Sequence, residues 1–169
     1  MLNVAIINGG RGAASLMPSL LSAASLQVTS IVNAYDDGKS TGEIRRFFGM
    51  LGPSDIRKVQ ELMLPEDHPD FTSSLHLFQF RYSQKINKDS ILGELEDYAK
   101  GRSQKITGVI FQSSLIDGSI RAFINEFIIT LKLIEKTTQE EFNFSDCSIM
   151  NCIYAGAFIY FNRNIEAAT

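Results

Sequence analysis

Residues 3–12 of the chain read Asn-Val-Ala-Ile-Ile-Asn-Gly-Gly-Arg-Gly, an apolar run that ends abruptly in glycines. The run over 3–8 predicts a short strand, and its length and β-branched side chains predict burial on both faces of a sheet. A helix with one leucine-rich face is expected over 13–24, and residues 26–33 are typical of a second strand. Strand, glycine turn, helix and strand in this order predict a βαβ unit with a right-handed crossover.

The pattern of the remaining chain is predominantly helical. Ser40 and Glu43 have capping-box spacing, which predicts a helix over 41–48. Ser54 is placed to cap the next helix. Further helices are predicted over 71–82, 90–99 and 116–135 and from Asp146 or Ser148 to the last residue, while 106–111 fits either a strand or the approach to a helix. The fold class is therefore α/β, with a mostly parallel sheet and many helices after residue 40.

The composition is that of an ordinary globular domain. Of 169 residues, 44% are hydrophobic and 21% are charged, which excludes a disordered chain, a coiled coil and a collagen-like fibre. The formal charge of −3 gives no basic surplus, so nucleic acid is not an expected partner. The most apolar stretches, 123–134 and 149–161, fall short of the roughly 18 apolar residues that cross a membrane. The N-terminus lacks a secretory pattern, so we expect a cytoplasmic protein without a membrane partner.

The glycine turn between the first strand and the first helix is a candidate anion site. Gly10-x-Gly12-x-x-Ser15 approximates the dinucleotide-binding fingerprint, with Ser15 where a third glycine would stand. Glycine lets the backbone approach a phosphate, and a helix N-terminus offers free N–H groups and the positive end of a dipole. The pattern fits a nucleotide or phosphate site, and it also fits a tight turn that binds nothing.

Two adjacent carboxylates, Asp36 and Asp37, follow the carboxyl end of the second strand. In open α/β sheets, ligands bind at that edge. The pair is suited to hold Mg²⁺ through water, to accept hydrogen bonds from ribose hydroxyls or to act as a base. Asp-Asp-Gly is also a common solvated turn. The helix start at Ser40-Thr41-Gly42, directly after the pair, favours the ligand-binding interpretation.

Cysteines and histidines give no sign of a metal site. Cys147 and Cys152 are too few for a disulfide framework, and their spacing of five residues matches neither a zinc knuckle nor a CxxC redox pair. We therefore expect two buried apolar residues on a helix. His68 and His76 lack a third ligand in register.

Several motifs, taken together and in order, resemble the 2-phospho-L-lactate transferase (CofD-like) family, which also contains the bacterial gluconeogenesis factor proteins. The motifs are Gly9-Gly10-x-Gly12, Asp36-Asp37-Gly38-x-Ser40-Thr41-Gly42-x-Ile44-Arg45, Pro53-x-Asp55-Ile56-Arg57, Leu77-Phe78-Gln79-x-Arg81-Tyr82 and Cys147-Ser148-Ile149-Met150-Asn151. The last two resemble the LFxxRF and HS-[LIV]-GN segments of the family. The resemblance covers residues 3–82 and 145–168, whereas 83–144 match no pattern that we can place.

The resemblance implies a Rossmann-like three-layer α/β/α fold in a single domain over 1–169, as the N-terminal part of a longer protein. Transferase members of the family move a phospholactyl-type group from a GDP-linked donor to a deazaflavin precursor, with Mg²⁺. Gluconeogenesis-factor members bind a nucleotide or nucleotide-sugar and act as regulators. The expected partners are therefore a nucleotide or phosphorylated small molecule, and either a second copy of the chain or a missing C-terminal half.

The resemblance also assigns site residues, position by position. Asp36 and Asp37 are the expected catalytic and Mg²⁺-binding residues. The expected ligand-binding residues are Gly9, Gly10, Arg11, Gly12, Ser40, Thr41, Arg45, Asp55, Arg57 and Asn151, with Arg45 or Arg57 as the phosphate clamp.

The chain departs from the family pattern at several positions. Arg11 stands where a small residue is usual, Lys39 and Ser54 stand where glycine is common, and Cys147 stands where histidine is expected. Met150 replaces a glycine, and its long side chain is expected to narrow the ligand site. Three interpretations therefore stay open: an active transferase, a non-catalytic regulator that binds a nucleotide-sugar, and a degenerate fragment that associates with another chain.

Overall fold

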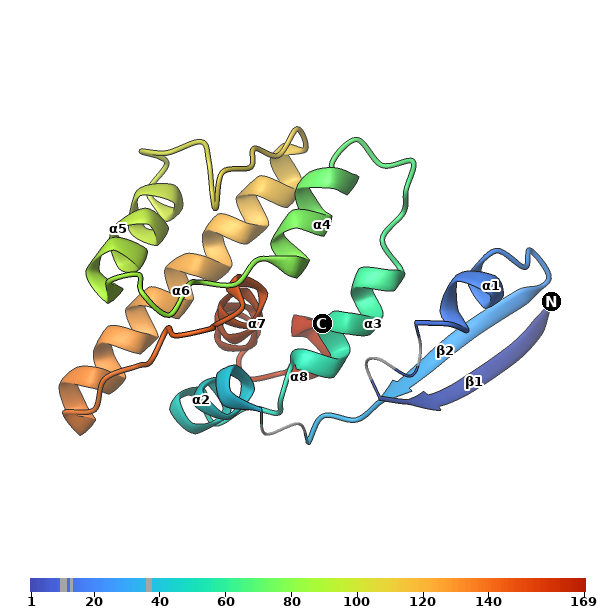
Figure 1. The fold of residues 1–169 in the computed structure, drawn as a ribbon, viewed down its shortest axis with the longest axis horizontal. Helices are drawn as coiled ribbons and strands as arrows, with labels where there is room; N and C mark the ends of the chain where they lie inside the picture. The colour runs from blue at the N-terminus through green and yellow to red at the C-terminus, as the bar shows by residue number, and fades with distance from the viewer. Residues whose placement is uncertain (10–11, 13, 36–37) are drawn as a thin grey trace.

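The computed structural model describes residues 1–9, 12, 14–35 and 38–169 of the chain. Four residues of the candidate site, Gly10, Arg11, Asp36 and Asp37, lie outside the described residues. The described part is a mixed α/β structure that is mostly helical and carries a small parallel sheet (Figure 1). The expected α/β class is confirmed, while the burial of the sheet and several helix ends differ from the predictions.

The predicted order of strand, turn, helix and strand is confirmed. β1 (Leu2–Asn8) and β2 (Leu26–Val32) pair in parallel from their first residues to their last. The helix between them, α1, covers Met17–Leu21 rather than the predicted 13–24. Pro18 stands in its first turn, where a residue without an N–H is tolerated. The chain forms turns before α1 begins, so this helix does not start at the glycine turn.

The strands are covered on one face, so the predicted burial on both faces is wrong. Half-buried residues alternate with exposed ones, and Ile7 and Ile31 are 84% and 51% exposed on the open face. The covered face packs against Met17 of α1 and Val59 of α3 (Ser54–Leu62), which form a small core of their own. In the described residues no second layer covers the open face, and the three-layer arrangement is not shown.

The helices after the sheet form the main body of the molecule. They are α2 (Lys39–Phe48), α3 (Ser54–Leu62), α4 (Phe71–Gln79), α5 (Lys88–Ala99), α6 (Ser114–Thr138), α7 (Ile149–Tyr160) and α8 (Ile165–Ala168). α6 packs along α7, and α2, α4 and α5 lie around this pair (Figure 1). Among the helices of the described chain, none is long and apolar enough to cross a membrane.

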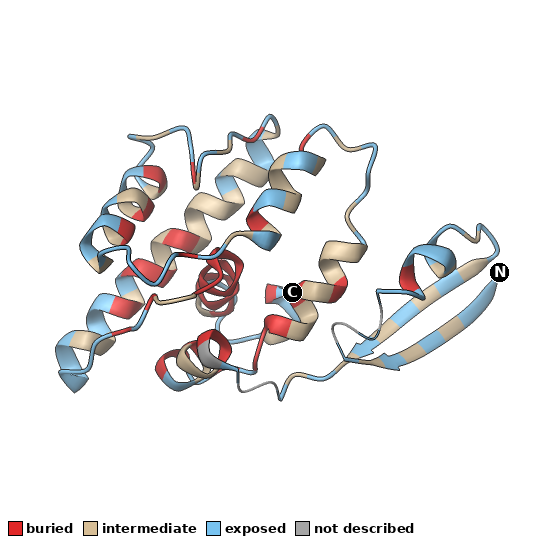
Figure 2. Cartoon of the chain, viewed as in Figure 1, coloured by how far each residue is buried: buried red, intermediate tan, exposed pale blue. Residues whose placement is uncertain are grey.

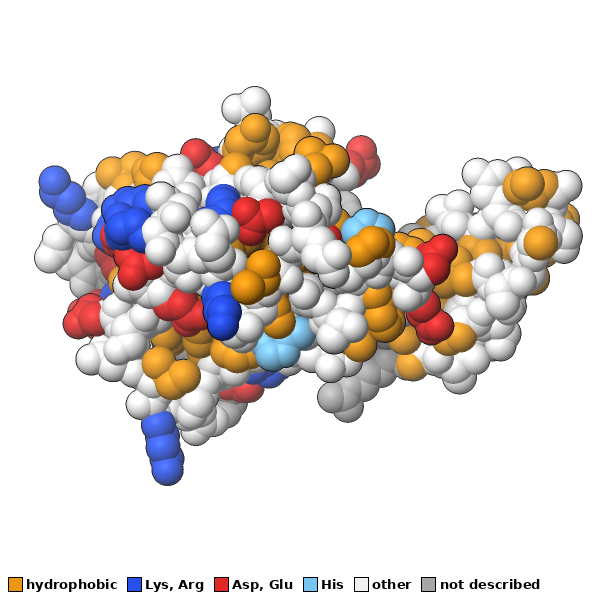
Figure 3. All heavy atoms as spheres, turned by 90° about the horizontal axis from the view of Figure 1, so that it is seen from above, with side chains coloured by type: hydrophobic (Ala, Val, Ile, Leu, Met, Phe, Trp, Pro, Cys, Tyr) orange, Lys and Arg blue, Asp and Glu red, His pale blue; other side chains and the backbone are white. Residues whose placement is uncertain are grey.

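The strands and α1 project from the main body (Figures 1 and 3), and α3 lies between the two parts (Figure 1). Figure 2 shows that the buried residues concentrate in the helical body, above all in α7, which is buried from Ile149 to Phe158. Phe48 stacks on Phe127 with ring centroids 5.2 Å apart, and Phe142 packs edge-on against both. The main core is therefore helical and aromatic, and the sheet lies outside it.

α5 and α6 confirm the helices predicted over 90–99 and 116–135. The segment 106–111, which fitted either a strand or a helix approach, forms no strand. Ile106 instead pairs with Val109 across a tight turn whose central residues have positive φ. The backbone N–H and C=O groups of Ile106 and Val109 therefore pair with each other across the turn and not with a strand of a sheet.

Two predicted helices end earlier than expected. α4 stops at Gln79 rather than at residue 82, because Phe80 is extended and Arg81 pairs with Ser148. α7 does not run to the last residue, because Asn162 and the residue after it adopt left-handed φ values of 53° and 65°. These left-handed residues end the helix, and the short α8 follows.

A glycine sets the distance between α6 and α7. A Cβ added at Gly156 would lie 1.7 Å from the carbonyl oxygen of Phe123. Packed interiors do not tolerate such an approach, so any larger residue forces the two helices apart. Because this helix pair forms the centre of the main core, the helical body depends on that contact.

Gly156→Ala is expected to lower the free energy of unfolding by about 3 kcal/mol, because the added methyl group displaces backbone rather than a flexible side chain. Gly93→Ala in α5 is the matched control, since its added Cβ meets nothing within 4 Å and alanine favours a helix. Urea unfolding followed by far-ultraviolet circular dichroism measures both variants. Equal stability of the two would contradict the role of Gly156.

Candidate functional site

Five buried polar side chains meet where α2, α3 and α7 converge, and we call them the buried polar cluster. They are Ser40 and Thr41 of α2, Ser54 of α3, and Ser148 and Asn151 at the start of α7. Asn151 Nδ2 donates to Ser40 Oγ at 3.1 Å and lies 3.5 Å from Ser54 Oγ. The hydroxyls of Thr41 and Ser54 share a hydrogen bond, and the N–H of Ser148 donates to Ser40 Oγ at 3.2 Å. Three distant motifs of the sequence thus meet at one place.

The predicted capping roles of the two serines are wrong. α2 begins at Lys39 with Gly38 as its N-cap, and α3 begins at Ser54 with Pro53 as its N-cap. Ser40 therefore lies inside α2, and its hydroxyl bonds to α7 instead of to its own helix. Ser and Thr hydroxyls can bond to local backbone or to distant groups, and here the tertiary partners prevail.

Two atoms of the buried polar cluster have hydrogen-bonding capacity left. Asn151 Oδ1 and Ser148 Oγ are buried and have no hydrogen-bond partner among the described residues. Leaving such an atom unpaired costs about 1–3 kcal/mol, so buried polar atoms normally find partners. These two atoms are therefore the unsatisfied polar positions of the cluster, and both belong to fully buried residues.

The glycine turn lies against the first turn of α3. The N–H of Gly12 donates to the carbonyl oxygen of Gly9 at 3.1 Å, which closes the turn. A Cβ added at Gly9 would lie 3.7 Å from Asp55 Oδ2. Asp55 also accepts a hydrogen bond from Lys58 Nζ at 2.7 Å. The structure thus brings two predicted site motifs, the glycine turn and the start of α3, into contact.

A cavity of about 460 Å³ opens at the carboxyl ends of β1 and β2, and Asn8, Gly9 and Asn33 contribute its polar lining. Asn8 Nδ2 donates to Ser30 Oγ at 2.8 Å. Asn8 Oδ1 is buried, and no described residue hydrogen-bonds to it. This is the sheet edge at which α/β proteins bind ligands. Asn8 was not among the predicted site residues, although its place at the end of the first strand could have indicated it.

The predicted phosphate clamps, Arg45 and Arg57, lie in different surroundings. The Arg45 guanidinium lies 4.8 Å from the ring centroid of Tyr35, the residue that precedes the two aspartates. Arg57 is buried, donates to the carbonyl oxygen of Phe78, and lies 3.6 Å from Glu61. Burial lowers the pKa of Arg57. Arg57 therefore joins α3 to the end of α4, whereas Arg45 lies against Tyr35.

The two cysteines are buried, as predicted, and their sulfur atoms are 3.7 Å apart. The hydrogen bond from Cys152 lowers the pKa of Cys147, and burial raises the pKa of Cys152. Their proximity escaped the sequence analysis because Cys147 precedes α7 and the spacing of five does not fit one helix face. Across the described part of the chain, no three Cys, His, Asp or Glu side chains form a metal-binding group.

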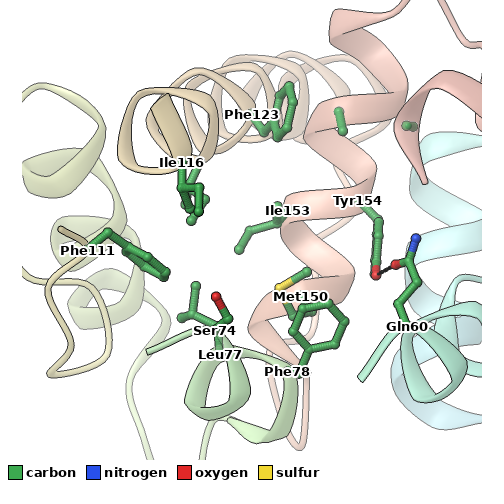
Figure 4. Close-up of a pocket in the computed structure, with 13 residues that line it drawn as sticks. Gln60, Ser74, Leu77, Phe78, Phe111, Ile116, Phe123, Met150, Ile153 and Tyr154 are labelled. Atoms are coloured by element: carbon green, nitrogen blue, oxygen red, sulfur yellow. Dashed lines mark hydrogen bonds between the residues drawn. The ribbon is translucent and has the colours of Figure 1, made fainter. Parts of the chain in front are cut away.

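A second cavity, of about 210 Å³, lies between α3, α4, α6 and α7 (Figure 4). Its lining is mostly apolar, and the hydrogen bond between Tyr154 and Gln60 lies at one side. Met150 lines this cavity, so its side chain occupies an apolar space between helices. Such a lining does not suit a phosphate, because a charged group would lose its water without gaining polar partners.

A sequence model of the family described as 2-phospho-L-lactate transferase CofD matches residues 4–139. The chain belongs to the CofD family. It is 35% identical over 79 residues to a protein of Nostoc sp. named as a gluconeogenesis factor. These 79 residues make up 47% of this chain and 16% of the length of that protein. Two relatives carry the same name. The one in Streptococcus pyogenes is 34% identical over 79 residues, which are 47% of this chain and 23% of that protein. The one in Thermotoga maritima is 28% identical over 95 residues, which are 56% of this chain and 29% of that protein.

The chain therefore spans less than a third of the length of these CofD-family relatives. The match confirms the resemblance and extends it through 83–139, where the sequence shows no motif that we could place. Hence the segment that carries α5 and α6 belongs to the CofD-family part of the chain. The Cys147–Asn151 segment lies beyond the matched residues, although the structure brings it against α2. Among solved structures, none matches the chain.

Asn151→Ala is expected to lower the free energy of unfolding by about 2–3 kcal/mol, because the Ser40 and Ser54 hydroxyls lose a buried hydrogen-bond donor. Asn3→Ala is the control, since Asn3 is exposed on β1 and its replacement should change stability by less than about 0.5 kcal/mol. Chemical unfolding of both variants tests this. If Asn151→Ala were as stable as the control, the cluster would not hold the three helices together.

Proposed function

We propose that this CofD-family chain binds a nucleotide or another phosphoester at the carboxyl edge of β1 and β2. One observation carries the proposal: Ser54 belongs to the buried polar cluster, while the next residue, Asp55, lies against Gly9. The start of α3 therefore joins the cluster to the glycine turn. The cavity at the strand ends and the unpaired oxygen of Asn8 support the same location.

The residues around this edge suit a phosphorylated ligand. Asp36 and Asp37 follow β2 after three residues, and we propose that they hold Mg²⁺, which would neutralise phosphate charge when bound. Arg45 is proposed as the cation that faces the phosphate, because its guanidinium lies beside the residue that precedes this pair. Asn151 and Ser148 supply the polar atoms deeper in the protein.

For the whole protein we propose the Rossmann-like three-layer fold. The exposed apolar residues Ile7 and Ile31 on the open face of the sheet support a further layer there. Parallel strands are rarely left open on one face, since they occur almost entirely in sheets covered by helices on both sides.

The leading proposal is a domain that serves transfer of a phospholactyl-type group from a GDP-linked donor to a deazaflavin precursor. A second candidate, a non-catalytic regulator that binds a nucleotide-sugar, is favoured by the names of the similar proteins, which describe gluconeogenesis factors. The two candidates use the same proposed site at the carboxyl edge of the strands and differ in their need for a metal. A cytoplasmic location is proposed for both.

Isothermal titration calorimetry with GDP, UDP-sugars and NAD, each with and without Mg²⁺, tests these candidates. Binding of GDP that requires Mg²⁺ and is lost in Asp37→Asn supports the transferase-type site, because the substitution removes a carboxylate charge without changing size. Binding of a UDP-sugar that is independent of Mg²⁺ supports the regulator.

Asp67→Asn is the matched control for the calorimetry, because Asp67 is exposed in the loop between α3 and α4 and lies outside the candidate site. Its binding should equal that of the unaltered chain. The absence of binding by all three ligand classes would contradict both candidates, and loss of binding in the control would show that Asp37→Asn acts through overall charge.

A further inference from the structure

The two cysteines of the chain form a pair of thiols at the start of α7. Cys147 lies just before the helix and Cys152 lies in its first turn, and their sulfur atoms are 3.7 Å apart. Both residues are fully buried, and both thiols are free. A disulfide bond is about 2 Å long, so a short approach of the two sulfur atoms is enough to form one. The chain contains no other cysteine, so each thiol has one possible partner within the chain.

Backbone hydrogen bonds hold Cys147 beside the helix. Its N–H donates to the carbonyl oxygen of Phe144 at 3.0 Å, and its own carbonyl oxygen accepts a hydrogen bond from the N–H of Tyr82 at 2.9 Å. Cys152 is held by α7, which is buried from Ile149 to Phe158. Since both backbones are fixed, the sulfur atoms remain neighbours in the folded chain, and rotation of the side chains is the motion that closes the remaining distance.

The surroundings of the pair favour the thiolate form of Cys147 over that of Cys152. The hydrogen bond with Cys152 lowers the pKa of Cys147, while burial opposes this shift. Ser40 and the charge of Arg81 lower this pKa further, and the charge of Glu43 raises it. Burial raises the pKa of Cys152. The thiolate is the nucleophile in the reactions of cysteine with oxidants, so Cys147 is the residue that reacts first.

We propose that Cys147 and Cys152 are a modification site, at which hydrogen peroxide converts the two thiols into a disulfide within the chain. In the first step the Cys147 sulfur attacks one peroxide oxygen, the O–O bond breaks, and water leaves as Cys147 becomes a sulfenic acid. In the second step the Cys152 sulfur attacks the Cys147 sulfur, the S–O bond breaks, and a second water leaves. The two thiols lose two electrons and two protons, and the peroxide is reduced to two molecules of water. A thiol such as glutathione reverses the change by exchange.

The disulfide closes a ring that contains two members of the buried polar cluster. Ser148 and Asn151 lie between the two cysteines in the sequence, and both bond to Ser40 Oγ of α2. Oxidation therefore ties together the first residues of α7 at the place where this helix meets α2, and it also restricts the unfolded chain. The modification site is independent of the ligand proposed above, since neither cysteine is among the residues assigned to that ligand.

Access of peroxide to the buried pair requires local opening of the chain. The loop between α6 and α7 leads directly to Cys147, and its residues 139–141 and Asn143 are exposed. Segments of this kind open without unfolding of the whole chain. Oxidation is therefore expected to be slow in the folded chain and to accelerate at urea concentrations that are too low to unfold it.

Alkylation in urea after treatment with hydrogen peroxide counts the thiols that remain. Peroxide should reduce the count from two to none, and dithiothreitol should restore both. The oxidised chain should migrate as a single copy on a non-reducing gel. Cys152→Ala is the matched control, because its Cys147 lacks a partner and should remain a sulfenic acid that dimedone traps. Two thiols that survive peroxide, or a disulfide that joins two copies of the chain, would overturn the proposal.

A second measurement uses the unaltered chain alone. The equilibrium between dithiol and disulfide, measured against glutathione, gives the effective concentration of the two thiols toward each other. This concentration should be about tenfold higher in the folded chain than in the chain unfolded in urea, because the fold keeps the sulfur atoms 3.7 Å apart. By linkage, the unfolding equilibrium constant of the oxidised chain should be lower by the same factor. An effective concentration that is equal or lower in the folded chain would mean that the fold opposes the disulfide, and the proposal would be wrong.

Discussion

The side-chain amide of Asn151 joins three segments that lie far apart in the sequence. Its nitrogen contacts Ser40 and Ser54, which are 111 and 97 residues away, at a place where all three side chains are buried. Burial of the amide nitrogen is costly unless it is hydrogen-bonded, so α2 and α3 present their hydroxyls to it together. Once α7 is placed in this way, Gly156 fixes how closely α6 lies against it.

The first turn of α3 connects the buried polar cluster to the sheet. Ser54 belongs to the buried polar cluster, Asp55 lies against Gly9, and Val59 packs on the sheet with Met17. A pair of parallel strands is not stable in isolation, so its position depends on this one helix and on α1. The candidate site therefore takes its geometry from a helix that belongs to both parts of the molecule.

Local patterns in the sequence were enough to predict the βαβ order and the long helices α5 and α6, because their apolar periodicity is strong. The helix starts at Ser40 and Ser54 were misjudged, since the capping spacing is the same whether a hydroxyl bonds to its own helix or to a distant one. Likewise, two arginines near the same motif look equivalent in sequence. Burial separates them, because Arg57 holds the carbonyl oxygen of Phe78 while Arg45 lies over Tyr35.

The candidate site lies on the border between a firmly packed body and a lightly held sheet. α7 is buried along most of its length, whereas the core between sheet and helices centres on Met17 and Val59. Segments with few buried contacts open at low free-energy cost, and sites that adapt to ligands are commonly built from them. Asn8 lies on the sheet and the buried polar cluster lies in the helical body, and α3 connects these two parts. The affinity of the proposed site for a ligand is therefore expected to depend on how well α3 holds the strands in place.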